Sequence, residues 1–481
     1  MGDRARRIVE SSGRVINKGV SCVVFCVLDL LDILLCVVFK VVDLVVEGEW
    51  KPCYCSSGSA KEAIRSGGGN ILVSEHGGES KILSLSSTTT MSSKILRLED
   101  ISDTLFSRPS LVSSQLKRLH INDSSHKNNN NNSTTSFTVN STIVEMLGRR
   151  RKHCHHPSAV AAARWSDCDC QICTGWNSPS SKGKLFVRTQ GPITPGEMRR
   201  GGEDVVFIHG FISSSAFWTE TLFPNFSGKV KSSYRLFAVD LLGFGRSPKP
   251  SECLYTEREH LEMIETSVLE PYKLQSFHIV AHSLGCILAL ALAVKYPRSV
   301  KSLTLLAPPF YPVPKSAAAH ATQYIMSRVA PRRVWPPITF GASMACWYEH
   351  ITRLICFVIC KNHRVWEFLT KLITRNRLRT FLMEGFFCHT HNAAWHTLHN
   401  IICGSAGKMD AYLAAVRDNI SCKVTVFHGR DDELIPIECS YELQKRIPRA
   451  NLKIIDHKDH ITIVVGRQQA FAQELEQIWT S

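Results

Sequence analysis

The sequence predicts an α/β fold in which a mainly parallel sheet carries helices on both faces and receives an inserted helical cap. Short apolar runs alternate with helical stretches from Lys184 onward, which is the rhythm of such a sheet. More than a hundred residues before Cys422 then interrupt this rhythm and are rich in Trp, Phe and Ile, as a cap would be. The 481 residues suffice for one such domain with appendages.

The expected strands are short apolar runs, each bounded by Gly, Pro, Asp or Ser. They lie at 185–187, 205–208, 236–239, 277–280, 303–306, 424–427 and 452–455. Residues 286–296 are apolar nearly all round and stop at Pro297, which predicts a helix buried against the sheet. Phe471, Leu475 and Ile478 repeat on one face and predict a final amphipathic helix.

These elements divide the chain into six expected parts. From about Ser56 to Ser141 the sequence is dominated by Ser, Gly, Asn and Thr without sustained apolar periodicity, which is typical of a disordered or loosely ordered tether. The parts are a hydrophobic signal or anchor at 1–50, the low-complexity linker at 51–150, a Cys/His-containing segment at 151–183, the first part of the core at 184–310, the helical cap at 311–422 and the second part of the core at 423–481.

The amino-terminal part joins basic residues to an apolar run at 20–39. Its Val, Leu, Ile and Phe residues favour membrane insertion by about 4 to 8 kcal/mol, whereas Asp29 and Asp32 oppose it by about 5 to 7 kcal/mol. A secretory signal, a signal anchor and an amphipathic helix on a membrane or on the protein itself all fit this balance. We expect export, and Asn-x-Ser/Thr sequons such as Asn225 and Asn419 agree with it.

Charge and cysteine content limit the partners. A formal charge of +15 favours weak attraction to anionic lipid headgroups or acidic polysaccharide, and no nucleic-acid-binding module accompanies it, so we expect no nucleic acid. Nine cysteines after residue 250 are spread singly and are interpreted as buried small hydrophobes. Disulfides, zinc and free thiols all stay open for another cluster, which consists of Cys154, Cys168, Cys170 and Cys173.

No metal and no cofactor are expected. Four histidines of the cap are interpreted as ordinary side chains of its helices rather than as zinc ligands. They are His389, His391, His396 and His399.

Residues 277–285 read as a strand, a sharp turn and the opening of a helix, with Ser283 at the apex. This is the context of the nucleophile elbow G-x-S-x-G, in which small neighbours keep the strand and the helix apart. Here Ala281 replaces the first Gly, and Gly285 supplies the second. The alternative for Ser283 is a helix N-cap.

A serine hydroxyl needs a base oriented by a carboxylate, and both are expected downstream. Asp432, after the strand at 424–427 and before a Pro, is the favoured acid, with Asp431 left open because a loop register is not fixed by sequence. His460 is favoured as the base over His457, because it directly precedes the apolar run into the last helix.

Acyl transfer also needs donors for the developing oxyanion. The strand at 205–208 ends in His209, Gly210 and Phe211, so the backbone amides of Phe211 and Leu284 are the expected pair, with His209 and Gly210 supporting the loop. The glycine-rich run 240–247 is expected to form a tight loop near the mouth of the site.

These motifs resemble the α/β-hydrolase superfamily from about Lys184 to the end, and in detail the plant BODYGUARD family of probable lysophospholipases. The resemblance rests on V-F-I-H-G-F-I-S-S-S-A-F-W at 206–218, A-H-S-L-G-C at 281–286 and D-H-K-D-H-I-T-I-V-V-G-R at 456–467. It implies an α/β-hydrolase fold and an extracellular or cell-wall protein, secreted or anchored at the outer face of the membrane. It further implies a role in cuticle formation, with cutin or related lipid acyl chains as substrates.

Two functions are expected as alternatives. The first is a serine ester hydrolase or transacylase of lipid acyl esters, in which Ser283 is acylated and water or an alcohol releases the acyl group. The second is a noncatalytic lipid-binding or scaffold protein of the cell wall on a hydrolase fold, which the complete set of catalytic residues disfavours.

Overall fold

The structure is a computed structural model that describes residues 2–47, 70–74, 80–84, 183–192, 203–250, 253–375 and 380–480. Its residues form two units, Met1–Phe25 with Ala159–Ser481, and Cys26–Ser158. The expected Cys/His-containing segment, with Cys154, Cys168, Cys170 and Cys173, lies outside the described residues except for its last position. In the second unit, β1 (Asn70–Ser74) pairs antiparallel with β2 (Ser80–Ser84) inside the expected linker.

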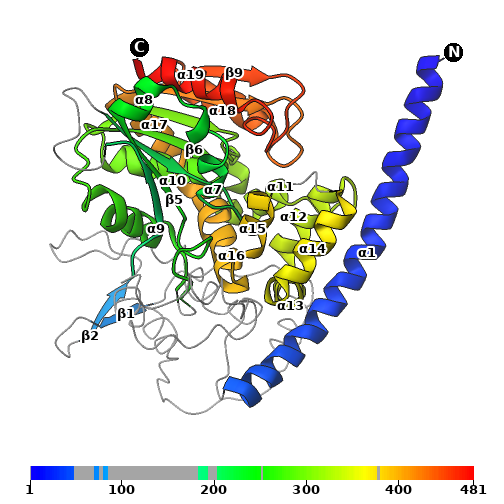
Figure 1. Ribbon diagram of the computed structural model, residues 1–481. Helices are drawn as coiled ribbons and strands as arrows, with labels where there is room; N and C mark the ends of the chain where they lie inside the picture. Colours follow the sequence, from blue (N-terminus) through cyan, green and yellow to red (C-terminus); the bar gives the residue numbers. More distant parts are fainter. Residues whose placement is uncertain are drawn as a thin grey trace. The chain divides into compact units, whose positions relative to one another are not determined.

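A seven-stranded sheet forms the centre of the first unit, in the order β3-β5-β4-β6-β7-β8-β9 (Figure 1). β3 runs antiparallel to β5, and every other neighbouring pair in this sheet is parallel. The strands are β3 (Val187–Gln190), β4 (Glu203–Ile208), β5 (Tyr234–Val239), β6 (Phe277–His282), β7 (Val300–Leu306), β8 (Lys423–Gly429) and β9 (Asn451–Ile455).

The first strand begins later than the sequence predicts. We expected it at 185–187, but β3 starts at Val187. The amide of Leu185 donates to the Ser267 hydroxyl over 2.8 Å, and that of Phe186 donates to the Ser247 hydroxyl over 2.9 Å. These side chains occupy the backbone donors that strand pairing would otherwise use.

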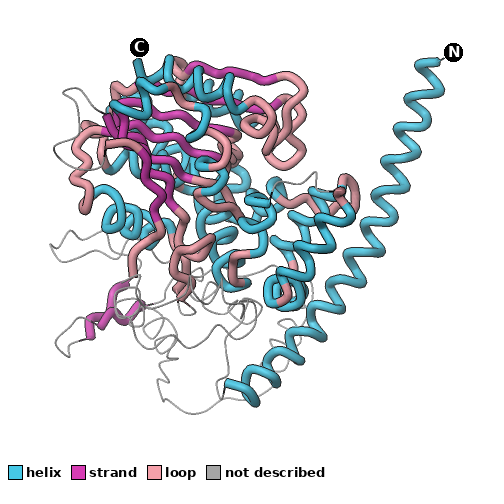
Figure 2. Tube along the Cα trace, viewed as in Figure 1, coloured by secondary structure: helices cyan, strands magenta, loops and turns pink. Residues whose placement is uncertain are grey.

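Helices cover both faces of the sheet (Figures 1 and 2). On one face, rings of Trp218 and Trp479 pack with Phe207 of β4 in a buried aromatic core. On the other face α10 is buried along almost its whole length, as expected for a helix without a polar side. The helices of these layers are α7 (Ala216–Thr219), η2 (Phe223–Asn225), α8 (Gly228–Ser233) and α19 (Gln468–Thr480), and α9 (Glu257–Ile264), η3 (Glu265–Leu269), α10 (Leu284–Lys295), α17 (Met409–Asn419) and α18 (Glu438–Arg446).

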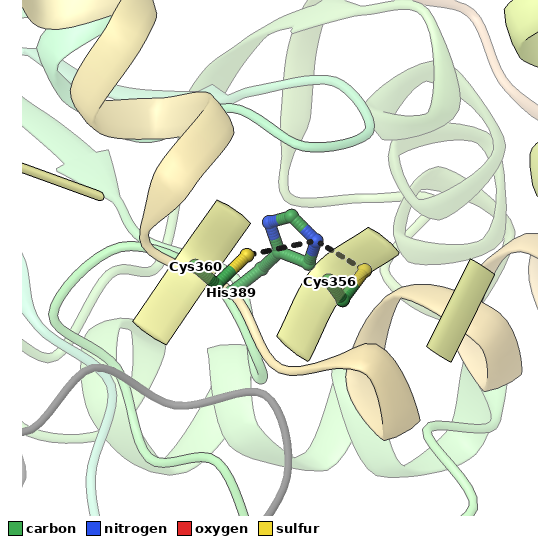
Figure 3. Close-up of side chains that lie close together, drawn as sticks. All are labelled: Cys356, Cys360 and His389. Carbon is green, nitrogen blue, oxygen red and sulfur yellow. Dashed lines mark hydrogen bonds between the residues drawn. The ribbon is translucent and has the colours of Figure 1, made fainter. Parts of the chain in front are cut away.

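Between β7 and β8 the chain forms a group of helices, coloured yellow to orange in Figure 1. On α13, Cys356 and Cys360 face His389, which lies between α15 and α16 (Figure 3). The helices are η4 (Lys315–His320), α11 (Ala321–Val329), α12 (Pro337–Trp347), α13 (Glu349–Lys361), α14 (His363–Ile373), α15 (Thr380–Phe387), α16 (His391–Thr397), η5 (Leu398–Cys403) and η6 (Gly404–Gly407).

The amino-terminal helix α1 covers Gly2–Glu47. Its 26-residue segment Asn17–Val42 contains a window of 18 residues with a mean hydropathy of 2.8, so it is long and apolar enough to cross a membrane, a test that a signal sequence also passes. Val23, Val27, Leu30 and Leu34 repeat along one exposed face of this helix.

Candidate active site

The carboxyl ends of the parallel strands carry the residues that the sequence singles out. Ser283 follows β6 at the centre of the sheet, and His209 follows the neighbouring strand β4. Asp432 and His460 come in the loops after β8 and β9. Parallel strands end at a common edge, so residues separated by more than 250 positions meet there, as ligand sites in α/β sheets do.

Ser283 occupies a strained turn between β6 and α10. Its φ of 52° and ψ of −122° put a non-glycine residue in the left-handed half of backbone space, at a cost of about 1 to 3 kcal/mol. A Cβ added at Gly285 would lie 2.7 Å from the His209 carbonyl oxygen and 2.8 Å from that of Ile208. Gly285 therefore allows α10 to approach β4 closely, as the elbow requires.

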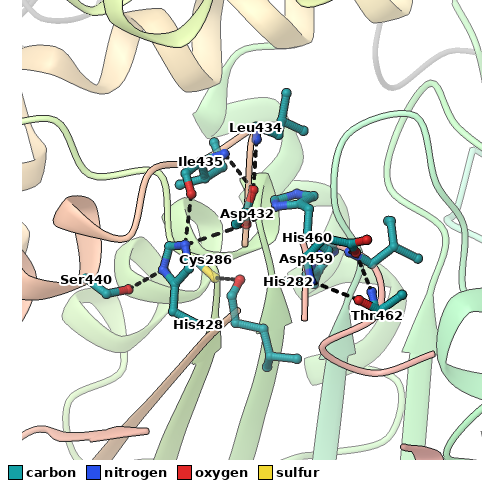
Figure 4. Close-up of polar contacts among 12 residues, drawn as sticks. His282, Cys286, His428, Asp432, Leu434, Ile435, Ser440, Asp459, His460 and Thr462 are labelled. Atoms are coloured by element: carbon teal, nitrogen blue, oxygen red, sulfur yellow. Dashed lines mark hydrogen bonds and ion pairs between the residues drawn. The ribbon is translucent and has the colours of Figure 1, made fainter. Parts of the chain in front are cut away.

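Asp432 and His460 form a direct hydrogen bond. The Nδ1–H group of His460 donates to Oδ2 of Asp432 over 2.7 Å, and both side chains are buried (Figure 4). The other oxygen of Asp432 accepts from the amides of Leu434 and Ile435 over 2.9 and 2.8 Å. With Nδ1 protonated, Nε2 of His460 carries the lone pair that a general base needs.

The alternatives left open by the sequence lie elsewhere. Asp431 is exposed, and its amide donates to the Lys458 carbonyl over 2.9 Å. His457 is also exposed, with a positive φ of 57°. The structure thus brings Asp432 and His460 together, and places Asp431 and His457 on the surface of the same loops.

Charge and hydrogen bonding keep the Asp432 carboxylate ionised. Burial alone raises its pKa, but His460, His428 and the Ile435 amide outweigh burial and hold the pKa of Asp432 below its usual value. The ring of His428 lies 3.5 Å from Oδ2 of Asp432. A carboxylate that stays charged is suited to stabilise an imidazolium that forms on His460.

Two buried histidines that the sequence analysis did not assign hold this arrangement. His282, directly before Ser283, donates from Nε2 to the His460 carbonyl over 2.9 Å, and the two rings lie 4.7 Å apart. Burial and the neighbouring His460 lower the pKa of His282 to about 3, so it remains neutral. His428 donates from Nε2 to the Ile435 carbonyl and accepts from the Ser440 hydroxyl. Their signal was available, since His282 directly precedes the elbow serine and His428 directly follows an expected strand, and a histidine buried at such a strand end needs a hydrogen-bond partner.

The expected oxyanion loop lies against the elbow. A Cβ added at Gly210 would lie 3.1 Å from the Ser283 Cβ, so the loop backbone passes beside the serine. Leu241 donates its amide to Nε2 of His209 over 2.9 Å, so the ring proton is on Nδ1, which donates to the Gly210 carbonyl over 2.7 Å. Holding this carbonyl also orients the next amide, that of Phe211, in the opposite direction.

Asp240 supports the same loop from the glycine-rich run 240–247. Its carboxylate accepts from the amides of Ser215 over 2.5 Å and of Arg246 over 2.8 Å. A Cβ added at Gly245 would lie 2.3 Å from Oδ2 of Asp240, and Gly245 has a φ of 53°, so only glycine fits there without displacement. The run therefore forms a tight loop whose Phe244 packs against His209 and Phe211, and we call this loop, residues 240–247, the wall.

A pocket of about 380 Å³ lies beside this wall, and its lining includes Asp240, Arg246, Phe381 and Glu384. Ser283, Asp432 and His460 are not among its lining residues. The hydrogen-bonded acid and imidazole, rather than this pocket, mark the chemistry, because only they supply a base with an orienting carboxylate. An apolar tunnel for an acyl chain stays a prediction.

Among the residues that the structure describes, Cys356, Cys360 and His389 are the group whose ligand atoms lie close enough to hold a metal ion, within 4.8 Å of one another. A hydrogen bond from Cys360 is the largest influence on the Cys356 thiol. With His389 and His391, it holds the pKa of that thiol well below its usual value against the effect of burial. All nine cysteines after residue 250 are buried, as predicted.

Comparison with known proteins places the chain in a family. The family model for the alpha/beta hydrolase fold matches residues 205–335. "Probable lysophospholipase BODYGUARD 3" of Arabidopsis thaliana is 56% identical over 494 residues, which covers 97% of each chain. The chain belongs to the BODYGUARD family of α/β hydrolases. "Probable lysophospholipase BODYGUARD 1" of the same plant is 54% identical over 478 residues, again 97% of each chain.

Family membership confirms the resemblance and the fold class predicted from the sequence. It also confirms, at the level of the family, the expected class of carboxylic ester hydrolase, since its members are named probable lysophospholipases. Among solved structures, the esterase EaEST from Exiguobacterium antarcticum aligns at 14% identity with a TM-score of 0.43, covering 62% of this chain and 96% of that one.

Proposed function

We propose that this BODYGUARD-family chain is a serine hydrolase of lipid acyl esters, in the manner of a lysophospholipase, with Ser283, His460 and Asp432 as its catalytic triad. The observation that carries the proposal is the 2.7 Å hydrogen bond from His460 to Asp432, held by His282 next to the strained Ser283. A buried carboxylate that orients an imidazole beside an elbow serine is the arrangement that activates a hydroxyl nucleophile.

In the proposed reaction, Oγ of Ser283 attacks the ester carbonyl carbon while its proton passes to Nε2 of His460. Asp432 stabilises the imidazolium, and the amides of Phe211 and Leu284 donate to the oxyanion of the tetrahedral intermediate. The bond to the alcohol oxygen then breaks, and His460 returns its proton to the leaving alcohol. Water, or a second alcohol in a transfer reaction, attacks the acyl-serine in the same way and frees Ser283.

The exposed face of α14 supports binding of the protein to a lipid surface, where it would take up its substrate. Val365, Phe368 and Leu372 follow one another at three and four residues and are 58%, 67% and 64% exposed. Arg364 and Arg375 are also exposed near this stripe and would contact anionic headgroups. An apolar stripe with basic neighbours is suited to the interface of a bilayer or micelle.

The lipid-surface role has its own test. Phe368→Glu with Leu372→Glu should lower activity on vesicles of lysophospholipid with anionic lipid by about tenfold, and leave hydrolysis of a soluble short-chain ester unchanged. Tyr441→Glu, at an exposed ring on α18, is the matched control. Equal activity of wild type and the double variant on vesicles would contradict this role.

We further propose that the protein is secreted, in the cell wall or anchored at the outer face of the membrane, and acts on acyl chains of cutin during cuticle formation. The apolar segment Asn17–Val42 and the implications of the family resemblance support this location. Asn225 and Asn419 are exposed, as glycan acceptors must be. A shift in mobility on glycosidase treatment, smaller in Asn225→Gln with Asn419→Gln, would support export, and unmodified protein in the cytosol would contradict it.

Labelling with a fluorophosphonate tests the catalytic proposal directly. We expect the full-length wild type to be labelled and Ser283→Ala to be unlabelled, while His457→Ala keeps the label because His457 is exposed outside the triad. Products from lysophospholipids, monoacylglycerols and hydroxy-fatty-acid esters then define the substrate. A folded wild type that is neither labelled nor active would overturn the proposal and favour the noncatalytic lipid-binding alternative.

A further inference from the structure

Two thiols and an imidazole converge inside the group of helices between β7 and β8. Cys356 and Cys360 lie four residues apart on α13 and therefore on the same face of the helix. Nε2 of His389 lies 3.5 Å from the Cys356 sulfur and 3.9 Å from the Cys360 sulfur (Figure 3). All three side chains are buried, with exposures of 6%, 1% and 4%.

The orientation of His389 is that of a ligand. Its Nδ1 lies 2.6 Å from the Phe386 carbonyl oxygen, which only accepts, so Nδ1 carries the proton. Nε2 therefore presents its lone pair to the two sulfurs. Histidines that bind metals donate their other ring nitrogen to a backbone carbonyl or carboxylate in this way, which fixes the tautomer and the plane of the ring.

The spacing of the three atoms fits a tetrahedral centre. Zinc lies about 2.3 Å from thiolate sulfur and about 2.0 to 2.1 Å from imidazole nitrogen, so sulfur and nitrogen ligands of one tetrahedron are about 3.6 Å apart. The two sulfur–nitrogen separations here, 3.5 and 3.9 Å, bracket that value. His391, two residues beyond His389, is buried and also hydrogen-bonds Cys356, but its ring nitrogens lie outside the set of ligand atoms that are all within 4.8 Å of one another.

We propose that Cys356, Cys360 and His389 form a structural zinc site, which His391 completes when its ring turns toward the ion. Two thiolates with imidazole nitrogens are the donor set of closed tetrahedral zinc centres, whereas magnesium and calcium prefer oxygen. The site departs from the expectation that no metal is bound, which considered His389 and His391 without the two cysteines on α13.

The ion would connect the cap helices to the wall of the active site. It would join α13 to the segment between α15 and α16, where His389 pairs with Phe244 in an antiparallel bridge. The Phe244 ring lies 5.9 Å from that of Phe211 and 6.1 Å from that of His209. The zinc site would therefore hold the wall against which the oxyanion loop packs, and its loss would act on both stability and activity.

The first test measures metal in the full-length protein, purified in detergent without added zinc. We expect about one zinc ion per chain by elemental analysis. Replacement by Co²⁺ should give the thiolate-to-metal charge-transfer band and the visible bands of a tetrahedral centre. Fewer than about 0.2 ions per chain, with no cobalt spectrum after reconstitution, would overturn the proposal.

Variants locate the ion. Cys356→Ser with Cys360→Ser should lose the zinc and the charge-transfer band, and His389→Gln should lose at least about five-sixths of the zinc. Cys403→Ser, at another buried cap thiol, is the matched control and should retain both. If the double variant fails to fold, chelation of the wild type should still lower its thermal midpoint, and restored zinc should raise it again. Zinc retained at full occupancy by folded Cys356→Ser with Cys360→Ser would also refute the site.

Discussion

At the carboxyl edge of the sheet, His460 donates its Nδ1 proton to the Asp432 carboxylate over 2.7 Å, whereas between the cap helices His389 donates its own to the Phe386 carbonyl over 2.6 Å. Both rings are buried, and both leave Nε2 as an acceptor. The difference lies in the partner of Nδ1. An ionised carboxylate can stabilise the imidazolium that forms when a base accepts a proton, while a backbone carbonyl fixes the tautomer and the plane of the ring, which suits metal binding.

The surroundings of Nε2 follow the same division. His460 is held by His282, the residue before the elbow serine, and in the proposed reaction it accepts and returns a proton there. His389 faces two sulfurs on α13, where a bound ion would stay in place. A buried histidine with the proton on Nδ1 is therefore a proposed base at the sheet edge and a proposed metal ligand in the cap. Exchanging or removing either partner tests this division.

The largest effect should come from removing each histidine in turn. His460→Gln should lower activity on an acyl ester by about 10⁴-fold or more and leave the zinc content unchanged. His389→Gln should lose zinc yet keep activity within about tenfold of the wild type, because it touches the site only through Phe244. Turnover and elemental analysis of the same preparations measure both, and a loss of both properties in both variants would break the comparison.

The next effect concerns the charge on the partner of His460. Asp432→Asn should lower kcat by about 10³- to 10⁴-fold, because an amide neither stabilises the imidazolium nor imposes the same tautomer. Asp431→Asn, one residue away on the surface, is the control and should keep nearly full activity. Equal losses in the two variants would show that the carboxylate of Asp432 has no special role.

The sequence allowed site residues to be predicted where they directly follow a strand of the parallel sheet. Ser283, Asp432 and His460 follow strands and could be predicted, because parallel strands must end at one edge. His282 and His428 were missed, since what they bind depends on loops folding back over the strand ends. Cys356 and His389 are separated by a turn, α14 and α15, so only packing of the helices brings them together.

Substitutions at two glycines should affect stability and activity differently. Gly285→Ala would place Cβ within 2.8 Å of two carbonyl oxygens of the strand end, and should lower the free energy of unfolding by about 1 to 3 kcal/mol. Gly210→Ala meets Ser283 and His282 at 3.1 and 3.0 Å, so it should cost less stability. It should lower kcat about tenfold by moving the Phe211 amide. Denaturant unfolding and turnover distinguish the two, and an active, stable Gly285→Ala would contradict the close approach of α10.

The smallest effect is a pH dependence of the free energy of unfolding. It comes from His282, a buried and neutral histidine that contacts His460. Its pKa falls from the usual 6.5 to about 3 in the folded chain through burial and the neighbouring His460. Between these values the unfolded chain binds a proton that the folded chain does not, so the free energy of unfolding falls as the pH is lowered. The contribution is at most about 1.4 kcal/mol per pH unit.

His282→Gln retains a donor for the His460 carbonyl. It should make the free energy of unfolding fall less steeply from pH 6 to 4, by a slope that corresponds to up to one proton, whereas the exposed His457→Gln should leave the slope unchanged. Identical slopes in the wild type and His282→Gln would mean that His282 takes up its proton in the folded state. The orientation of His460 would then not depend on an uncharged His282.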